Sequence, residues 1–169
     1  MAQVQPSPYV LMLGELCGDN VSFLGERGFR VCLESDVTAR PAGTFAGALL
    51  WDSLSLMPLA ESRKRVELLF RSLVPGGALL AFFDTPGPAA HRARVRYRMH
   101  SRNQVTSEFI HGRSAVAHPY QNGDIVRLFE FFDVETLQMR RDGRRDVLLY
   151  KDWPDAAGAR PAGSARRSS

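Results

Sequence analysis

Four short, largely apolar runs constrain the fold of this chain more than any other feature. Each is five to seven residues long and is followed by a glycine or an acidic residue. They are Tyr9–Leu13, Phe29–Leu33, Phe45–Trp51 and Ala78–Phe83. A strand that is buried on both faces has no polar alternation, so such runs predict a mainly parallel sheet covered on both sides.

Helical patterns separate these runs. Apolar residues recur at helical spacing over Leu59–Leu73, with charged residues on the opposite face. Asn20 is a candidate N-cap for a short helix that Gly28 ends, and Asp124 is a candidate N-cap for a helix that runs through Phe132. Residues 37–44 are predicted to be a loop. The alternation of strands and helices predicts an α/β fold.

The second half of the chain changes to period-two patterns. Polar and apolar residues alternate over His91–Arg98, and Gln104–Ile110 is predicted to pair back with this strand. Residues 111–121 are predicted to be a loop. Val134–Arg140 and Arg145–Lys151 flank an Asp-Gly dipeptide, which is the strongest short-range signal for a β-hairpin.

Length and charge predict one domain with a tail. The chain has 169 residues, and we expect residues 1–155 to form the domain and residues 156–169 to form a disordered basic tail. The tail carries three arginines and no acid, so the net charge of +4 leaves a nearly neutral body and makes nucleic acid an unlikely partner. The chain has no apolar run long enough for a membrane span and no leader pattern at its start, so we expect a cytoplasmic protein.

The order of these features resembles the class I S-adenosylmethionine (SAM)-dependent methyltransferases. The segment LLFRSLVPGGALLAFFD is similar to that family's helix, Pro-Gly-Gly turn and fifth strand. The segment DIVRLFEFFDVETLQMRRDGRRDVLLYKD is similar to its last helix and its sixth and seventh strands. The resemblance implies a Rossmann-like sheet, mainly parallel, that closes with a C-terminal antiparallel hairpin.

The resemblance also implies a cofactor site for SAM. Gly14 and Gly18 match the first and third glycines of the family's loop after its first strand, and Glu15 lies between them. Glu34 follows the second strand, where an acid binds the ribose hydroxyls. Asp52 follows the Phe45–Trp51 run, where family members contact cofactor or substrate. No catalytic side chain is assigned.

This sequence departs from the family pattern in three places. Met12 replaces the acid of the glycine loop, and Leu16 replaces its middle glycine. Only eight residues precede the first strand, so we expect no helix covering the cofactor. The segment between Asp36 and Phe45 is too short for the family's second helix and third strand, so we expect a sheet that lacks one strand.

Two functions are consistent with these observations. The chain is a SAM-dependent methyltransferase acting on an unknown acceptor, or it is a catalytically inactive protein of the same fold that serves as a binding or regulatory partner. A second copy that fills the edge of the missing strand would make it a homodimer.

Four arginines alternate along the predicted strand at 91–98. They are Arg92, Arg94, Arg96 and Arg98. They form either a solvated strand face or a contact for an acidic protein partner or a nucleic-acid backbone, with Glu108 as one partner inside the chain.

The remaining residues with chemical potential have structural interpretations. We expect Cys17 and Cys32 to be buried thiols and Trp51 to be a core residue. The four histidines are too scattered for a compact metal motif, so we expect no metal site.

Overall fold

The core of the protein is a six-stranded sheet with the order β2-β1-β3-β4-β8-β7. The computed structural model describes residues 8–85, 90–101 and 104–152, so the predicted tail lies outside the described residues. The first four strands in this order are parallel to one another, and β8 pairs antiparallel with both of its neighbours, β4 and β7. The strands are β1 (Tyr9–Gly14), β2 (Arg30–Leu33), β3 (Phe45–Trp51), β4 (Leu73–Phe83), β7 (Phe132–Met139) and β8 (Arg145–Lys151).

This topology confirms the predicted Rossmann-like sheet and its C-terminal hairpin. It also confirms that one strand is missing, because among the described residues β2 pairs only with β1, and the segment between β2 and β3 holds α2 but no strand. The predicted loop at 37–44 is wrong in part. A one-turn helix, α2 (Asp36–Ala39), begins there, and its Val37 is buried in the core.

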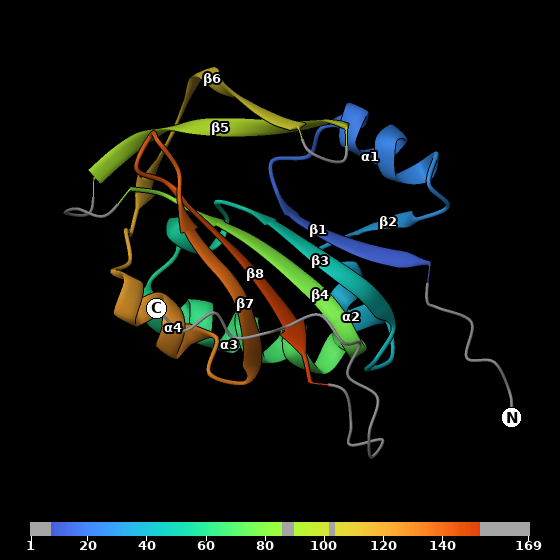
Figure 1. Cartoon of the computed structure of the whole chain (residues 1–169). Coiled ribbons are helices and arrows are strands. Elements are labelled where there is room, and N and C mark those ends of the chain that lie inside the picture. The colour runs from blue at the N-terminus through green and yellow to red at the C-terminus, as the bar shows by residue number, and fades with distance from the viewer. Residues whose placement is uncertain (1–7, 86–89, 102–103, 153–169) are drawn as a thin grey trace, which may run out of the picture.

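Helices cover one face of the sheet. They are α3 (Leu59–Ser72), α4 (Asn122–Leu128), α2 and the short 3₁₀ helix η1 (Leu54–Leu56). In Figure 1, α3 and α4 lie together below the sheet. Val66 and Leu69 of α3 and Ile125 of α4 are buried with the side chains on the lower face of the strands. Because these apolar positions recur at helical spacing, α3 is the helix that the sequence predicts best.

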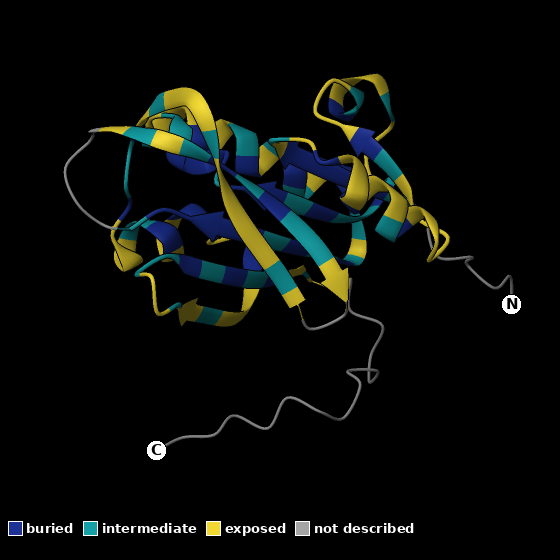
Figure 2. Ribbon diagram, turned by 90° about the horizontal axis from the view of Figure 1, so that it is seen from above, coloured by how far each residue is buried: buried dark blue, intermediate teal, exposed yellow. Residues whose placement is uncertain are grey.

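A long hairpin covers the other face together with α1 (Gly18–Gly25). The hairpin consists of β5 (Ala90–Ser101) and β6 (Gln104–Ala117), which form a separate two-stranded sheet in the described part of the chain. It crosses above the sheet, and its outer surface is largely exposed while the strands beneath it are buried (Figure 2). Val95 and Tyr97 of β5 join Trp51 and Phe82 in a second core. The predicted loop at 111–121 is wrong in part, because residues 111–117 continue β6, whereas residues 118–121 form a loop before α4.

Three predicted boundaries also differ from the structure. Asn20 lies inside α1 and does not cap it, because its buried amide binds the backbone of β5. Helix α4 begins at Asn122 and ends at Leu128. Phe132 begins β7, where its ring packs edge-on against Phe70. Strand β4 begins at Leu73, where its register with β3 shifts before Ala78.

Candidate functional site

The candidate site lies at the carboxyl ends of the four parallel strands. An acidic residue follows each strand at this edge: Glu15 after β1, Glu34 after β2, Asp52 after β3 and Asp84 after β4. After β1 the chain adds β2 on one side of β1, and it then crosses over to add β3 on the other side. In open α/β sheets, ligands bind in the crevice at such a switch point. The sequence therefore places its candidate residues at the edge where this fold binds ligands.

The two glycines of the predicted loop have different environments. Gly14 has φ +107°, and a Cβ built on it would lie 2.5 Å from the Trp51 carbonyl oxygen. Gly14 is therefore required by the close approach of β1 to β3. A Cβ on Gly18, at the start of α1, would meet no atom within 4 Å. The fold does not require a glycine at this position, and the open space leaves the backbone accessible to a ligand.

The Glu34 carboxylate lies apart from the other acids of this edge. It forms an ion pair with Arg65 of α3, and its side chain remains 51% exposed. The carboxylate is thus accessible, but its partner in this structure comes from the helical face of the sheet. A role for Glu34 in binding a ribose stays a prediction.

The hairpin supplies the partners of the other three acids. Arg94, Arg96 and Arg113 surround the Glu15 carboxylate, and Arg92 pairs with Asp84 at 3.2 Å. Arg98 pairs with Asp19 of α1 at 2.7 Å and with Glu108 at 3.2 Å. The predicted partner Glu108 is confirmed. The interpretation as a solvated strand face is wrong, because these side chains are about one-third exposed and are neutralised by acids of this chain.

Asp52 is the most unusual acid of the site. Its φ is +52°, which is rare for a residue with a side chain. Its Oδ2 accepts a 2.7 Å hydrogen bond from the Tyr97 hydroxyl and lies 3.6 Å from Arg144. Burial raises the pKa of Asp52 above its usual range, although the Tyr97 hydrogen bond and Arg144 act in the opposite direction. Burial also raises the pKa of Tyr97, so the Tyr97 hydroxyl stays protonated and donates its hydrogen bond to Asp52.

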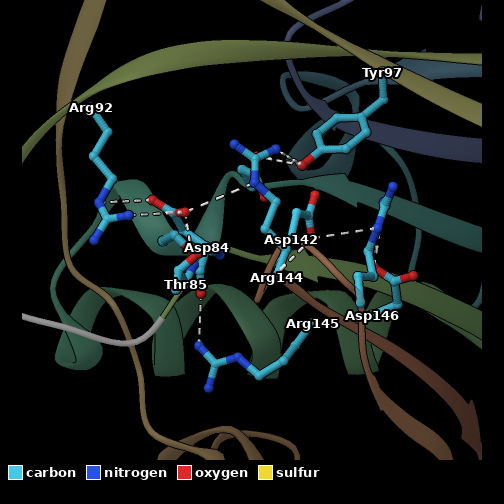
Figure 3. Close-up of polar contacts among 11 residues, drawn as sticks. Asp84, Thr85, Arg92, Tyr97, Asp142, Arg144, Arg145 and Asp146 are labelled. Atoms are coloured by element: carbon cyan, nitrogen blue, oxygen red, sulfur yellow. Dashed lines mark hydrogen bonds and ion pairs between the residues drawn. The ribbon is translucent and has the colours of Figure 1, made fainter.

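Arg144 joins the ends of three strands. It follows the Asp-Gly turn and donates a 2.8 Å hydrogen bond to the Tyr97 hydroxyl oxygen. Its Nε lies 4.0 Å from Asp84. From below, the fully buried Arg145 donates to the Asp84 carbonyl oxygen at 2.8 Å. Figure 3 shows this network, with Arg92 and Arg144 approaching Asp84 from opposite sides.

A cavity of about 510 Å³ opens beside this network. It lies between the end of β4, the hairpin β5–β6 and the β7–β8 turn, and its walls include Asp84, Arg92, Phe109 and Arg144. A narrow pocket of about 20 Å³ adjoins it and is lined in part by Trp51 and Asp52. The larger volume falls within the range of pockets that bind small molecules. The two spaces share Asp84, Arg92 and Arg144 among their lining residues.

The pKa of Asp52 gives a testable pH dependence of stability. Because the pKa of Asp52 is higher in the folded chain than in the unfolded chain, folding favours the protonated form. That stabilisation is complete below the unfolded-state pKa and is lost as the pH rises through the folded-state pKa. The Asp52→Asn variant has no such loss, and asparagine tolerates a positive φ. Its free energy of unfolding relative to wild type should rise from acid to neutral pH.

Urea denaturation of both proteins between acid and neutral pH measures this difference. The matched control is Glu130→Gln, which replaces an exposed acid. The difference in the free energy of unfolding between this variant and wild type should be nearly constant with pH. A difference that falls with rising pH for Asp52→Asn would contradict the raised pKa.

Sequence reasoning missed Asn20, Tyr97, Asp84 and Arg144 as members of this region. Two of them left a signal. Asp84 follows a buried strand just as Asp52 does, and Tyr97 lies on the apolar side of an alternating strand. Asn20 contacts Tyr97 across 77 positions of the chain, and Arg144 contacts it across 47. No local pattern reports such contacts.

The structural predictions for Trp51, Cys17 and Cys32 are confirmed. Trp51 is a core residue stacked on Tyr97 with ring centroids 5.2 Å apart. Cys17 and Cys32 are free and buried. Among the described residues, no group of His, Cys, Asp and Glu could hold a metal ion, and no helix could span a membrane.

The chain matches no protein-family model and no curated protein in sequence. Its structure is similar to solved methyltransferases. A SAM-dependent methyltransferase from Methanosarcina mazei has a TM-score of 0.57 at 13% identity, and the match covers 89% of this chain and 95% of that protein. The 1,6-didemethyltoxoflavin-N1-methyltransferase of Burkholderia thailandensis, solved with S-adenosylhomocysteine, has a TM-score of 0.56 at 16% identity, covering 85% and 71%.

A third similar structure is an amino pentose methyltransferase from Micromonospora echinaspora, solved with SAM bound. Its TM-score is 0.51 at 15% identity, and the match covers 85% of this chain and 83% of that protein. These likenesses agree with the mainly parallel α/β sheet described above. The chain therefore has the fold of the class I SAM-dependent methyltransferases, with one strand fewer beside β2.

Proposed function

We propose that this chain binds SAM at the carboxyl edge of β1, β2 and β3 and transfers its methyl group to a small-molecule acceptor. The observation that carries the proposal is the cavity of about 510 Å³ beside the end of β4, with a narrow pocket next to it that is lined by Trp51 and Asp52 at the end of β3. A methyl donor at the switch point and an acceptor in the cavity would meet near the end of β3.

The residues at the switch point are suited to an adenosyl ligand. The open space above Gly18 admits a ligand to the start of α1, and the exposed Glu34 can accept hydrogen bonds from ribose hydroxyls. Bound SAM supplies a methyl group activated by a sulfonium. The contribution of the chain is to align the acceptor and to exclude water. Trp51, Tyr97 and the hairpin help to exclude water because they bury the floor of the pocket.

Solved relatives of the fold support the choice of cofactor and the size of the acceptor. The Burkholderia enzyme holds S-adenosylhomocysteine and 1,6-didemethyltoxoflavin, and the Micromonospora enzyme acts on an amino pentose. Both acceptors are small molecules, which agrees with the volume of the cavity here.

Calorimetric titration of the full chain with SAM tests the proposal. Wild type should bind with micromolar affinity. Gly18→Leu should weaken binding about tenfold or more, because the side chain fills the space that the ligand needs. Gly25→Leu is the matched control, since Gly25 lies at the other end of α1 and also has no atom within 4 Å of an added Cβ.

Two results would contradict this proposal. One is the absence of heat from a folded wild-type protein at concentrations on the order of 100 μM. The other is equal affinity of both glycine variants, which would place the ligand away from the start of α1. The first result would favour the alternative function, a binding partner without catalysis.

A further inference from the structure

The carboxylate of Glu15 is enclosed by three arginines that come from both strands of the hairpin. Arg113 Nη1 lies 3.2 Å from Oε1, Arg94 Nη2 lies 3.5 Å from Oε2, and Arg96 Nη2 lies 3.9 Å from Oε1. The Glu15 side chain is only 14% exposed. A single carboxylate in the loop after β1 therefore faces three guanidiniums.

The charges of this cluster are not balanced. Its three guanidiniums face two carboxylates, which leaves one positive charge in excess. The members are Arg94, Arg96 and Arg113 on one side and Glu15 and Glu108 on the other. In addition, the buried Nε atom of Arg96 has no hydrogen-bond partner among the described residues. The cluster has the charge and the donors for one further anionic group.

The cluster does not carry the main attachment of the hairpin to α1. The Asn20 side chain binds the backbone of Tyr97 and Met99 at 2.8 Å each. Arg98 binds Asp19 at 2.7 Å. The contacts to Glu15 are longer, at 3.2 to 3.9 Å. Since hydrogen bonds between charged groups are strongest near 2.8 Å, Glu15 is held less firmly than its neighbours.

We propose that Arg94, Arg96 and Arg113 form a site for the carboxylate at the amino-acid end of SAM and that Glu15 competes for this site. The inference rests on the proposed function. Glu15 directly follows Gly14 at the switch point, so a ligand that crosses this loop would bring its carboxylate to the same guanidiniums. Arginine suits this task because its planar guanidinium binds carboxylates through two parallel hydrogen bonds.

Two ligands separate the carboxylate site from the rest of the cofactor site. S-adenosylhomocysteine carries the amino-acid end, and methylthioadenosine has the same adenosyl thioether without it. Each is titrated calorimetrically into the full chain. In Glu15→Gln, which removes the competing charge, affinity for S-adenosylhomocysteine should rise about tenfold. Affinity for methylthioadenosine should stay within about twofold of wild type.

Two further variants complete the experiment. Asp19→Asn removes the neighbouring carboxylate that holds the hairpin to α1, and it should leave the ratio of the two affinities unchanged. Arg113→Gln, whose side chain is 61% exposed, should weaken S-adenosylhomocysteine about fivefold without affecting methylthioadenosine. Thermal unfolding of each variant verifies that it is folded.

The outcomes distinguish this inference from the proposed function. If both ligands bind and Glu15→Gln leaves their affinity ratio unchanged or lowers it, the carboxylate site is wrong and the proposed function stands. If neither ligand binds to wild type or to Glu15→Gln, both are wrong. A ratio that rises equally in Glu15→Gln and Asp19→Asn would assign Glu15 to fastening the hairpin and would also overturn the inference.

Discussion

Replacing Tyr97 by alanine should lower the free energy of unfolding by about 3–5 kcal/mol, the range for removing a buried aromatic ring. The Tyr97 ring is fully buried between the hairpin and the sheet, with centroids 5.2 Å from Trp51 and 4.9 Å from Phe82. Domains of this size have total stabilities of roughly 5–15 kcal/mol, so the loss would be a large share. Urea denaturation measures it.

Tyr97→Phe separates the ring from the hydroxyl. It keeps the packing but removes the donor to Asp52 and the acceptor for Arg144. The expected loss is about 1–3 kcal/mol, since a buried carboxylate loses a partner. Phe109→Ala is the control on the same hairpin. Phe109 is 66% exposed, so its loss should stay within about 0.5 kcal/mol. Equal effects of Tyr97→Ala and Phe109→Ala would mean that the hairpin does not pack on Trp51.

The sheet could be predicted from the sequence because local patterns specify it. The continuous apolar runs correspond to β1 and β3, and the Asp-Gly turn separates β7 from β8 as expected. The missing strand was predictable from length alone, because too few residues separate β2 from β3. Buried parallel strands and tight hairpins leave signals within a few residues of sequence, so each can be recognised without knowledge of the rest of the fold.

The position of the hairpin could not be predicted in this way. Strands β5 and β6 were expected, but their packing across the sheet depends on contacts such as Asn20 with Tyr97, which are 77 positions apart. The same limit applies to the site. The sequence identified Glu15, Glu34 and Asp52 as acids at one edge of the sheet. It could not reveal that the arginines of β5 lie above Glu15, because that depends on how the hairpin folds back.

Replacing Gly14 by alanine should destabilise the protein by roughly 2–5 kcal/mol, from two independent causes. At φ +107° a residue with a side chain is strained, and the new Cβ would lie 2.5 Å from the Trp51 carbonyl oxygen. Gly14 and Trp51 are paired at the last position of the β1–β3 register, so relieving the contact would separate the two strands at the switch point. The denaturation midpoint in urea should fall accordingly.

Gly18→Ala is the matched control for this prediction. The added Cβ meets no atom within 4 Å at the start of α1, and alanine favours a helix over glycine by about 1 kcal/mol. Its stability should therefore equal or exceed that of wild type. A Gly14→Ala variant as stable as Gly18→Ala would mean that β1 and β3 do not approach so closely. In that case the strand pair would not need a glycine at position 14, and the role of Gly14 would be to leave room for the ligand.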